Sequence, residues 1–167
     1  MSLEKEIIDF AITFLIAFFI MKIFLPEILG IDLTAVVSSS MEHRDDIYKK
    51  HYQFLQERYN YSIEYINSWP FKNGFKIGDV LVSIKTKDFK VGDVVLYRSC
   101  GNIPISHRII YKNDSFYSIK GDNNYDFLIN YCINEQKIEE ERIISKVYFI
   151  LPKIGYLRVL IYYLFNI

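Results

Sequence analysis

The sequence predicts a mainly β domain, an antiparallel sandwich or barrel, that follows an N-terminal transmembrane helix and carries an inserted helix. An apolar run near the N-terminus, Phe10 to Met21, contains no charged residue. Beyond Trp69, short β-branched runs alternate with turn sequences, as in antiparallel sheets. Between these two regions, aromatic and apolar residues recur at helical spacing. The expected division is an anchor over residues 1–29 and one domain over residues 30–167.

The composition limits the possible partners and cofactors. The chain has 167 residues, of which 51% are hydrophobic, and its 20 basic residues balance its 20 acidic ones. Because the basic residues are scattered among acids, no nucleic-acid partner is expected. The two cysteines, Cys100 and Cys132, lack a metal-ligand spacing, so no metal or other cofactor is expected. Two buried free thiols are the favoured interpretation, and pairing outside the cell is the alternative.

The anchor is predicted over the apolar stretch from Ile7 to Leu29. Lys22 can extend its amine to the interface and Asp9 can lie at the opposite surface, so the shorter uncharged core still fits a tilted span. A cleaved signal peptide fits less well, since neither a basic start nor a small-residue cleavage site is present. A buried core helix is disfavoured because bulky apolar residues cover every face. The flanking charges barely fix the orientation of the span.

The body of the chain predicts one helix followed by several strands. Acidic residues at Asp45 and Asp46 precede a periodic tyrosine-rich run, which predicts an inserted helix over about residues 44–68 that ends before Pro70. The strands are expected at Val80–Ile84, Val94–Tyr97, Ile103–Tyr111, Phe116–Lys120 and Ile143–Ile150. The C-terminal residues 152–167 are too short for a second span, so they predict an interfacial helix or a docked strand.

The residues that can carry chemistry lie in three short segments. Three serines and Met41 follow a valine run, and this arrangement predicts that one hydroxyl lies at the end of a strand. His107 shares one face of a predicted strand with isoleucines, a setting in which histidine is more often a core residue. Asp122 follows Gly121 in a turn composition. His43 and His51 lie in the polar helical segment and are expected to be solvated.

These segments together resemble the signal peptidase I family, in its archaeal and endoplasmic-reticulum branch. The resemblance rests on SSSMEH, GDVVLYR, SHRII and KGDNN, and it extends from about Ala35 to Tyr156. This branch uses histidine where the bacterial enzymes use lysine as the base, and position 107 is histidine. The chain departs from the family pattern at His43, where proline usually follows Ser-Met-Glu, and in its tyrosine-rich insertion.

The resemblance implies a role for each matched residue. Ser40 matches the nucleophile, Ser38 matches a hydroxyl that helps the oxyanion hole, and His107 matches the general base. Asp122 matches the aspartate of the Gly-Asp-Asn-Asn box. The family has a second aspartate further downstream, and Asp126 is the nearby candidate. Asp126 is therefore predicted to orient His107, while Asp122 braces the turn.

These roles agree with the chemistry of the side chains. A serine hydroxyl needs a base near neutral pH, and an imidazole can take its proton and pass it to the leaving amine. The backbone N–H of Ser40 and the Ser38 hydroxyl are candidate donors to the oxyanion. A substrate strand can add beside Ala35, Val36, Val37 and Ser39, which gives main-chain hydrogen bonds with little demand on sequence.

The expected function is a membrane-bound serine endopeptidase that removes signal peptides from exported preproteins. The implied location is the cell membrane, with one span and an extracytoplasmic domain. The implied partners are secretory signal peptides, the lipid bilayer and, by proximity, the protein translocation channel. One alternative is a catalytically silent, membrane-anchored β-domain that binds exported chains. A self-cleaving, repressor-like peptidase is disfavoured by the anchor and by histidine at position 107.

Overall fold

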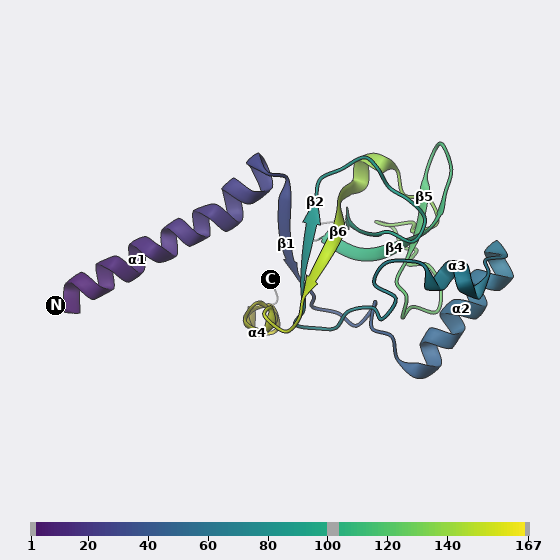
Figure 1. Cartoon of the computed structure of the whole chain (residues 1–167), viewed down its shortest axis with the longest axis horizontal. Coiled ribbons are helices and arrows are strands. Elements are labelled where there is room, and N and C mark those ends of the chain that lie inside the picture. The colour runs from purple at the N-terminus through teal and green to yellow at the C-terminus, as the bar shows by residue number, and fades with distance from the viewer. Residues whose placement is uncertain (1–2, 100–103, 166–167) are drawn as a thin grey trace.

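The computed structural model describes residues 3–99 and 104–165. A long N-terminal helix extends to one side of a β-sheet, and a pair of helices lies at the opposite end of the molecule (Figure 1). The long helix and the sheet with its helix pair thus occupy different parts of the molecule (Figure 1).

The N-terminal helix consists of α1 (Leu3–Phe19), which continues in the wider turns of η1 (Ile20–Ile28). Pro26 lies inside η1, and wider turns accommodate a residue that has no backbone N–H to donate. Within the described residues, Leu3–Ile28 is the one helix that is long and apolar enough to cross a membrane, with 26 residues and an 18-residue stretch whose mean hydropathy is 2.3. At 1.5 Å per residue such a helix is about 39 Å long, enough for the hydrocarbon core of a bilayer.

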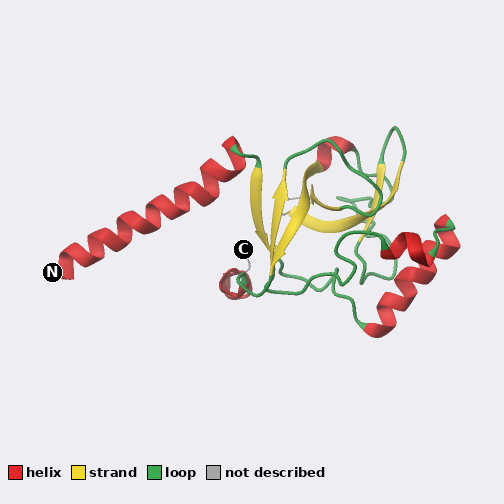
Figure 2. Ribbon diagram, viewed as in Figure 1, coloured by secondary structure: helices red, strands yellow, loops and turns green. Residues whose placement is uncertain are grey.

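The strands form one six-stranded antiparallel sheet in the order β1-β2-β6-β3-β4-β5 (Figure 2). Their bounds are Ile31–Ala35 (β1), Val80–Ile84 (β2), Val94–Arg98 (β3), Pro104–Lys112 (β4), Tyr117–Lys120 (β5) and Ile143–Leu151 (β6). The antiparallel prediction is confirmed, and each predicted strand is present within a residue or two. The predicted start of β4 at Ile103 lies outside the described residues. Helices make up a larger share than a mainly β domain implies, and the strands form a single sheet.

Both faces of the sheet are covered. Neighbouring residues of a strand point to opposite faces, and in β3 Val95 and Leu96 belong to two different clusters of buried residues. Val95 packs with Ile109 and Ile119 on one face, whereas Leu96 packs with Met41 on the other. This two-sided burial explains why the β3 sequence is apolar throughout instead of alternating.

The insertion folds as two helices instead of the predicted one. The first, α2 (Asp45–Tyr59), ends at Asn60, whose φ of 56° is left-handed. The second, α3 (Ile63–Asn67), begins after Ser62, whose hydroxyl accepts a hydrogen bond from Tyr65 N–H. Asparagine is one of the few residues that tolerate the left-handed conformation, so it ends the first helix without great strain. Pro70 follows α3, as predicted.

The last elements are the short helix η3 (Glu140–Arg142), strand β6 and helix α4 (Tyr156–Phe165). The helix was one of the two alternatives predicted for the C-terminus. It is tied to the sheet at Gly155, whose N–H donates to Gly78 O at 2.8 Å. A Cβ atom at Gly78 would lie 2.7 Å from the ring of Tyr156, so the contact requires glycine there. Cys132 is disulfide-bonded, contrary to the free-thiol prediction, and Cys100 lies outside the described residues.

Candidate active site

The serine segment leaves the sheet at the end of β1 and turns sharply. Val36 still pairs with the chain before β2, since its N–H donates to Asp79 O at 2.8 Å. Met41, which directly follows the three serines, is fully buried and fixes the segment on the sheet. Asn123 holds the other side, donating from its backbone N–H to Ser40 O and from its amide to Ser39 O, both at 2.8 Å. The serine segment and the Gly-Asp-Asn-Asn loop are thereby joined, although they are far apart in the sequence.

The structure brings Ser40 and His107 together, as predicted. His107 lies in β4, opposite Val95 of β3, and its side chain is only 3% exposed. Its Nε2 atom lies 2.9 Å from Ser40 Oγ. The ring therefore faces the partly buried serine, and not solely the isoleucines of the core.

The carboxylate that contacts His107 is that of Glu135, not that of Asp126. Glu135 is fully buried, and its Oε1 lies 2.5 Å from His107 Nδ1. The Asp126 side chain is 68% exposed and lies 3.8 Å from Arg58. The Asp126 side chain thus points outward to solvent. This corrects the prediction that Asp126 orients His107. Glu135 was not predicted from the sequence, because this glutamate lies in a loop with several acidic residues and no recognisable motif.

The hydrogen bonds around Glu135 define the protonation of the histidine. Glu135 accepts from Tyr97 Oη at 2.5 Å and from Leu128 N–H at 2.6 Å, in addition to His107. Burial and the charge of Glu135 raise the pKa of Tyr97 far above its usual range, so this hydroxyl remains a donor. With Tyr97 and Leu128 donating to it, the Glu135 carboxylate is also the acceptor in its contact with His107 Nδ1. We therefore assign the Nδ1–H tautomer to His107, which leaves the Nε2 lone pair free to accept the Ser40 proton.

Two groups beside Ser40 can serve an oxyanion. Ser38 Oγ lies 3.2 Å from Ser40 Oγ, and because Ser40 has its single proton on the His107 side, Ser38 is the donor of this pair. Within the part of the chain that the structure describes, the Ser40 N–H donates no hydrogen bond. Both predicted donors thus lie at the serine, as an oxyanion hole requires.

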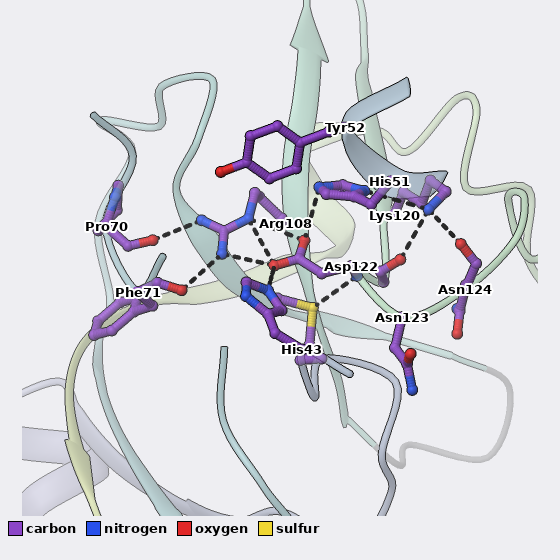
Figure 3. A network of polar contacts seen from close by, with 12 residues as sticks. His43, His51, Tyr52, Pro70, Phe71, Arg108, Lys120, Asp122, Asn123 and Asn124 are labelled. Atoms are coloured by element: carbon purple, nitrogen blue, oxygen red, sulfur yellow. Dashed lines mark hydrogen bonds and ion pairs between the residues drawn. The ribbon is translucent and has the colours of Figure 1, made fainter. Parts of the chain in front are cut away.

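Asp122 lies behind this site in a buried ionic network (Figure 3). Arg108 donates to it from Nη2 at 2.8 Å and from Nε at 3.0 Å, and His43 Nε2 lies 2.8 Å away. His51 Nε2 is 3.4 Å from its other oxygen. Burial alone would raise the pKa of Asp122, but the Arg108 charge and the His43 contact hold it well below its usual range. The Asp122 carboxylate thus contacts Arg108, His43 and His51, and not His107. These contacts agree with the predicted role of bracing the turn.

The two histidines of this network were predicted to be solvated, and that prediction is wrong. The α2 helix turns His51 inward, where it is 3% exposed, and burial lowers its pKa to about 4. His43 lies against Asp122 (Figure 3). For His51 the sequence held a usable signal. It lies one helical turn before the buried Leu55 and therefore on the same face of the helix.

Lys120 fixes the loop from within. It is fully buried, and its Nζ donates to Gly121 O at 3.1 Å and to Asn124 O at 2.5 Å (Figure 3). Burial lowers the pKa of this amine to about 8, and the charge of Asp122 opposes that shift. The amine closes the turn that presents Asn123 to the serine segment, and a glycine is required at 121 because a Cβ there would lie 2.9 Å from His107 Nε2.

The segment predicted to bind substrate lies at the outer edge of the sheet. Val36 uses both its N–H and its carbonyl toward the β2 side, and it is buried. Because main-chain groups alternate along a strand, those of Ala35 and Val37 point to the open edge. There Tyr163 of α4 donates to Val37 O at 3.3 Å. Ser39 O is already bonded to Asn123 and Val37 O to Tyr163, so of the four predicted residues Ala35, together with the N–H of Val37, presents main-chain groups at the open edge.

The described residues contain no cluster of three or more histidine, cysteine, aspartate or glutamate side chains able to hold a metal ion. Comparisons with family models, with curated proteins and with solved structures found no match for this chain.

Proposed function

We propose that this chain is a membrane-anchored serine endopeptidase that removes signal peptides from exported preproteins, with a signal-peptidase-like domain. The observation that carries the proposal is the line of contacts from Ser40 Oγ to His107 Nε2, at 2.9 Å, and from His107 Nδ1 to Glu135, at 2.5 Å. A hydroxyl, an imidazole and a buried carboxylate in this order form the arrangement that activates a serine nucleophile.

In this mechanism Ser40 Oγ attacks the scissile carbonyl carbon while its proton passes to His107 Nε2. Glu135 stabilises the imidazolium that forms, and the Ser40 N–H with the Ser38 hydroxyl stabilise the oxyanion. When the intermediate collapses, the C–N bond breaks and His107 gives its proton to the leaving amine. A water molecule, deprotonated by His107, then hydrolyses the acyl-enzyme and restores Ser40.

The substrate class follows from the position of the site relative to the anchor. β1 begins three residues after η1 ends, so the edge strand that leads to Ser40 lies close to the end of the apolar helix. A signal peptide leaves the bilayer as an extended segment beside such a strand and adds to its open edge. The resemblance of the serine, histidine and Gly-Asp-Asn-Asn segments to signal peptidases supports the same substrate. It also implies one span, an extracytoplasmic domain and a location close to the translocation channel.

The decisive experiment compares cleavage of a secretory precursor by membranes containing the wild-type chain or one serine variant. Ser40→Ala should abolish cleavage, because it removes the hydroxyl that lies 2.9 Å from His107 Nε2. Ser39→Ala is the matched control and should retain most activity, since its main-chain carbonyl, and not its hydroxyl, makes its contact with Asn123. Activity retained in Ser40→Ala would exclude the proposed nucleophile.

The same experiment decides the second candidate. A catalytically silent domain that binds exported chains would leave precursors uncut with the wild-type chain while still retaining them on the membranes. Cleavage that depends on Ser40 would rule out this alternative.

A further inference from the structure

Tyr97 is a buried ionisable side chain that has no step in the proposed mechanism. It lies in β3 and is fully buried in the same core cluster as Val95 and Ile109. A buried tyrosine usually finds a hydrogen-bond partner for its hydroxyl. Here Tyr97 Oη donates to Glu135 Oε1 at 2.5 Å and lies 3.2 Å from His107 Nδ1. The hydroxyl therefore touches both side chains that act on the proposed nucleophile.

The sheet fixes the position of Tyr97 relative to the histidine. In the antiparallel pair of β3 and β4, Val95 lies opposite His107 and Tyr97 lies opposite Ile105. Tyr97 and His107 are therefore diagonal neighbours on one face of the sheet, and their ring centroids are 6.1 Å apart. Since both residues belong to strands that pair with each other, the distance between the two rings does not depend on a loop.

Glu135, in contrast, reaches the histidine from a loop. Its N–H donates to Leu128 O at 3.1 Å and its carbonyl accepts from Ile119 N–H at 2.8 Å. Its carboxylate is held at both oxygens, because Oε2 accepts from Leu128 N–H at 2.6 Å and Oε1 accepts from Tyr97. Within the described residues, Tyr97 and His107 are the two partners of Oε1. Without the Tyr97 hydroxyl, only the imidazole itself would orient this oxygen.

The hydroxyl also takes a share of the Glu135 charge. Burial and the charge of Glu135 raise the pKa of Tyr97 far above its usual range, and the charge of Arg142, from η3, opposes this rise without cancelling it. Tyr97 is therefore an uncharged donor at working pH. The titratable groups at the His107 ring are Ser40 at Nε2, and Tyr97 and Glu135 at Nδ1. A carboxylate that also accepts from a tyrosine attracts the imidazolium less strongly than one that accepts from the imidazole alone.

We propose that Tyr97 is a positioning residue for the proposed reaction, which holds Glu135 against His107 and moderates the basicity of the imidazole. The inference rests on the proposed function, because it takes His107 as the base that serves Ser40. An imidazole that is too basic keeps the proton that it must pass to the leaving amine, and one without a fixed carboxylate loses its orientation. Tyr97 meets both requirements from a strand of the sheet.

The test removes the hydroxyl alone, in the full chain in detergent micelles with a fluorogenic precursor peptide. Tyr97→Phe should lower kcat roughly 10- to 100-fold, the effect of losing one hydrogen bond to a charged group. KM should stay within about twofold, because Tyr97 is buried and away from the open edge of β1. The acid limb of the pH–rate profile should move to higher pH by about half to one pH unit, since Glu135 then acts on His107 with its full charge.

Tyr117→Phe is the matched control. Tyr117 is a buried tyrosine of the same core cluster, and its hydroxyl also donates to a glutamate, Glu140, at 3.0 Å. This variant should lower the melting temperature as Tyr97→Phe does, while kcat and the acid limb stay at their wild-type positions. A Tyr97→Phe protein with the wild-type kcat, or with a lower kcat and an unmoved acid limb, would overturn the inference, because Tyr97 would then only fill space.

A second background keeps the test independent of the stability of Tyr97→Phe. With Glu135→Gln no buried carboxylate loses a donor, and Tyr97→Phe should there change the residual rate by less than about threefold. A larger loss would overturn the inference, since Tyr97 would then act by a route other than the Glu135 charge. An absence of Ser40-dependent cleavage by the wild-type chain would overturn the proposed function, and this inference with it. Failure of the Tyr97 predictions alone would leave the proposed function standing.

Discussion

Glu135 acts on the proposed reaction through His107, since its carboxylate contacts the imidazole and not the serine. It holds the ring in the tautomer that accepts from Ser40 and stabilises the charge that the ring gains. An amide at this position keeps the shape of the side chain but loses its charge and can present an N–H to Nδ1. The role of Glu135 is therefore separable from its packing.

Glu135→Gln should lower the cleavage rate by roughly three to four orders of magnitude, the scale on which a triad carboxylate acts when its geometry is kept. Asp126→Asn is the matched control and should remain near the wild-type rate, because the Asp126 side chain is exposed. Initial rates with a fluorogenic precursor peptide, with the melting temperature of each variant, provide the measurement. A rate loss in Asp126→Asn with an active Glu135→Gln would restore the assignment drawn from the sequence.

The sequence predicted two members of this site and missed the third for a physical reason. Ser40 and His107 lie in segments with recognisable neighbours, a valine run and a strand with an alternating face. Glu135 is selected by the fold alone, because the loop between β5 and β6 returns its carboxylate to the sheet beneath Tyr97. Nothing in the residues that flank Glu135 distinguishes it from the other glutamates of that loop.

His51 should make the domain sensitive to mild acid. Burial lowers its pKa to about 4 from an ordinary value near 6.5, so between these values the unfolded chain binds more protons than the folded one. The free energy of unfolding should therefore decrease as the pH falls from about 6.5 to 4, by roughly 3 kcal/mol at most. Asp122 contributes below that window, where unfolded aspartates become protonated.

His51→Gln should flatten the stability profile between about pH 4 and 6.5, because the side chain no longer titrates there. The measurement is thermal or denaturant unfolding in detergent across this range, for the wild type and the variant. An unchanged acid dependence in His51→Gln would assign the loss of stability to other groups.

At the scale of elements, Arg108 fastens the insertion to the sheet. From β4 its guanidinium donates to Pro70 O at 2.7 Å and Phe71 O at 3.2 Å, just after α3, and to Gly92 O at 2.8 Å before β3. Its remaining donors bind Asp122 in the Gly-Asp-Asn-Asn loop. One buried side chain therefore connects four segments of the chain.

Removing this side chain should cost about 3–5 kcal/mol of unfolding free energy, the usual effect of leaving one partner of a buried ion pair alone. We expect this for Arg108→Met, measured by denaturant unfolding. Arg58→Met removes an exposed partner of Asp126 at 3.8 Å and should change the stability by less than about 1 kcal/mol. In a double-mutant cycle, Arg108→Met and Asp122→Asn should be strongly non-additive. Additive effects would show that the two side chains stabilise the fold independently.

The insertion shows how far periodicity predicts an element. The steps between tyrosines predicted a helix across the whole segment, and the residues are indeed helical on both sides of the break. The break itself depends on Asn60 in the left-handed conformation and on the Ser62 cap, two local features that a periodic pattern does not contain. Strand β2, which has a turn on each side, was predicted to the residue, and the other predicted strands differ from the structure by a residue or two.

At the scale of the whole molecule, the structure favours one span. Helix α4 has 10 residues and is about 15 Å long, half of what a bilayer core requires. Residues 31–165 should therefore lie on one side of the membrane and the N-terminus on the other. Protease added to spheroplasts should digest the domain and a C-terminal tag while sparing an N-terminal tag. A C-terminal tag protected together with the N-terminal one would show that the last segment crosses the bilayer.

The order of the strands has a consequence for the protein during its synthesis. β6 is the last strand in the sequence but pairs with β2 on one side and β3 on the other, so it is the element that joins two half-sheets. Ser40 lies between the two strands of one half, β1 and β2, and His107 belongs to β4 of the other half. A chain still being made has neither a continuous sheet nor the contact between Ser40 and His107 until the residues through Leu151 have emerged. Under the proposed function, a newly synthesised chain therefore has no means of cutting a precursor until strand β6 has been made and has joined the two half-sheets.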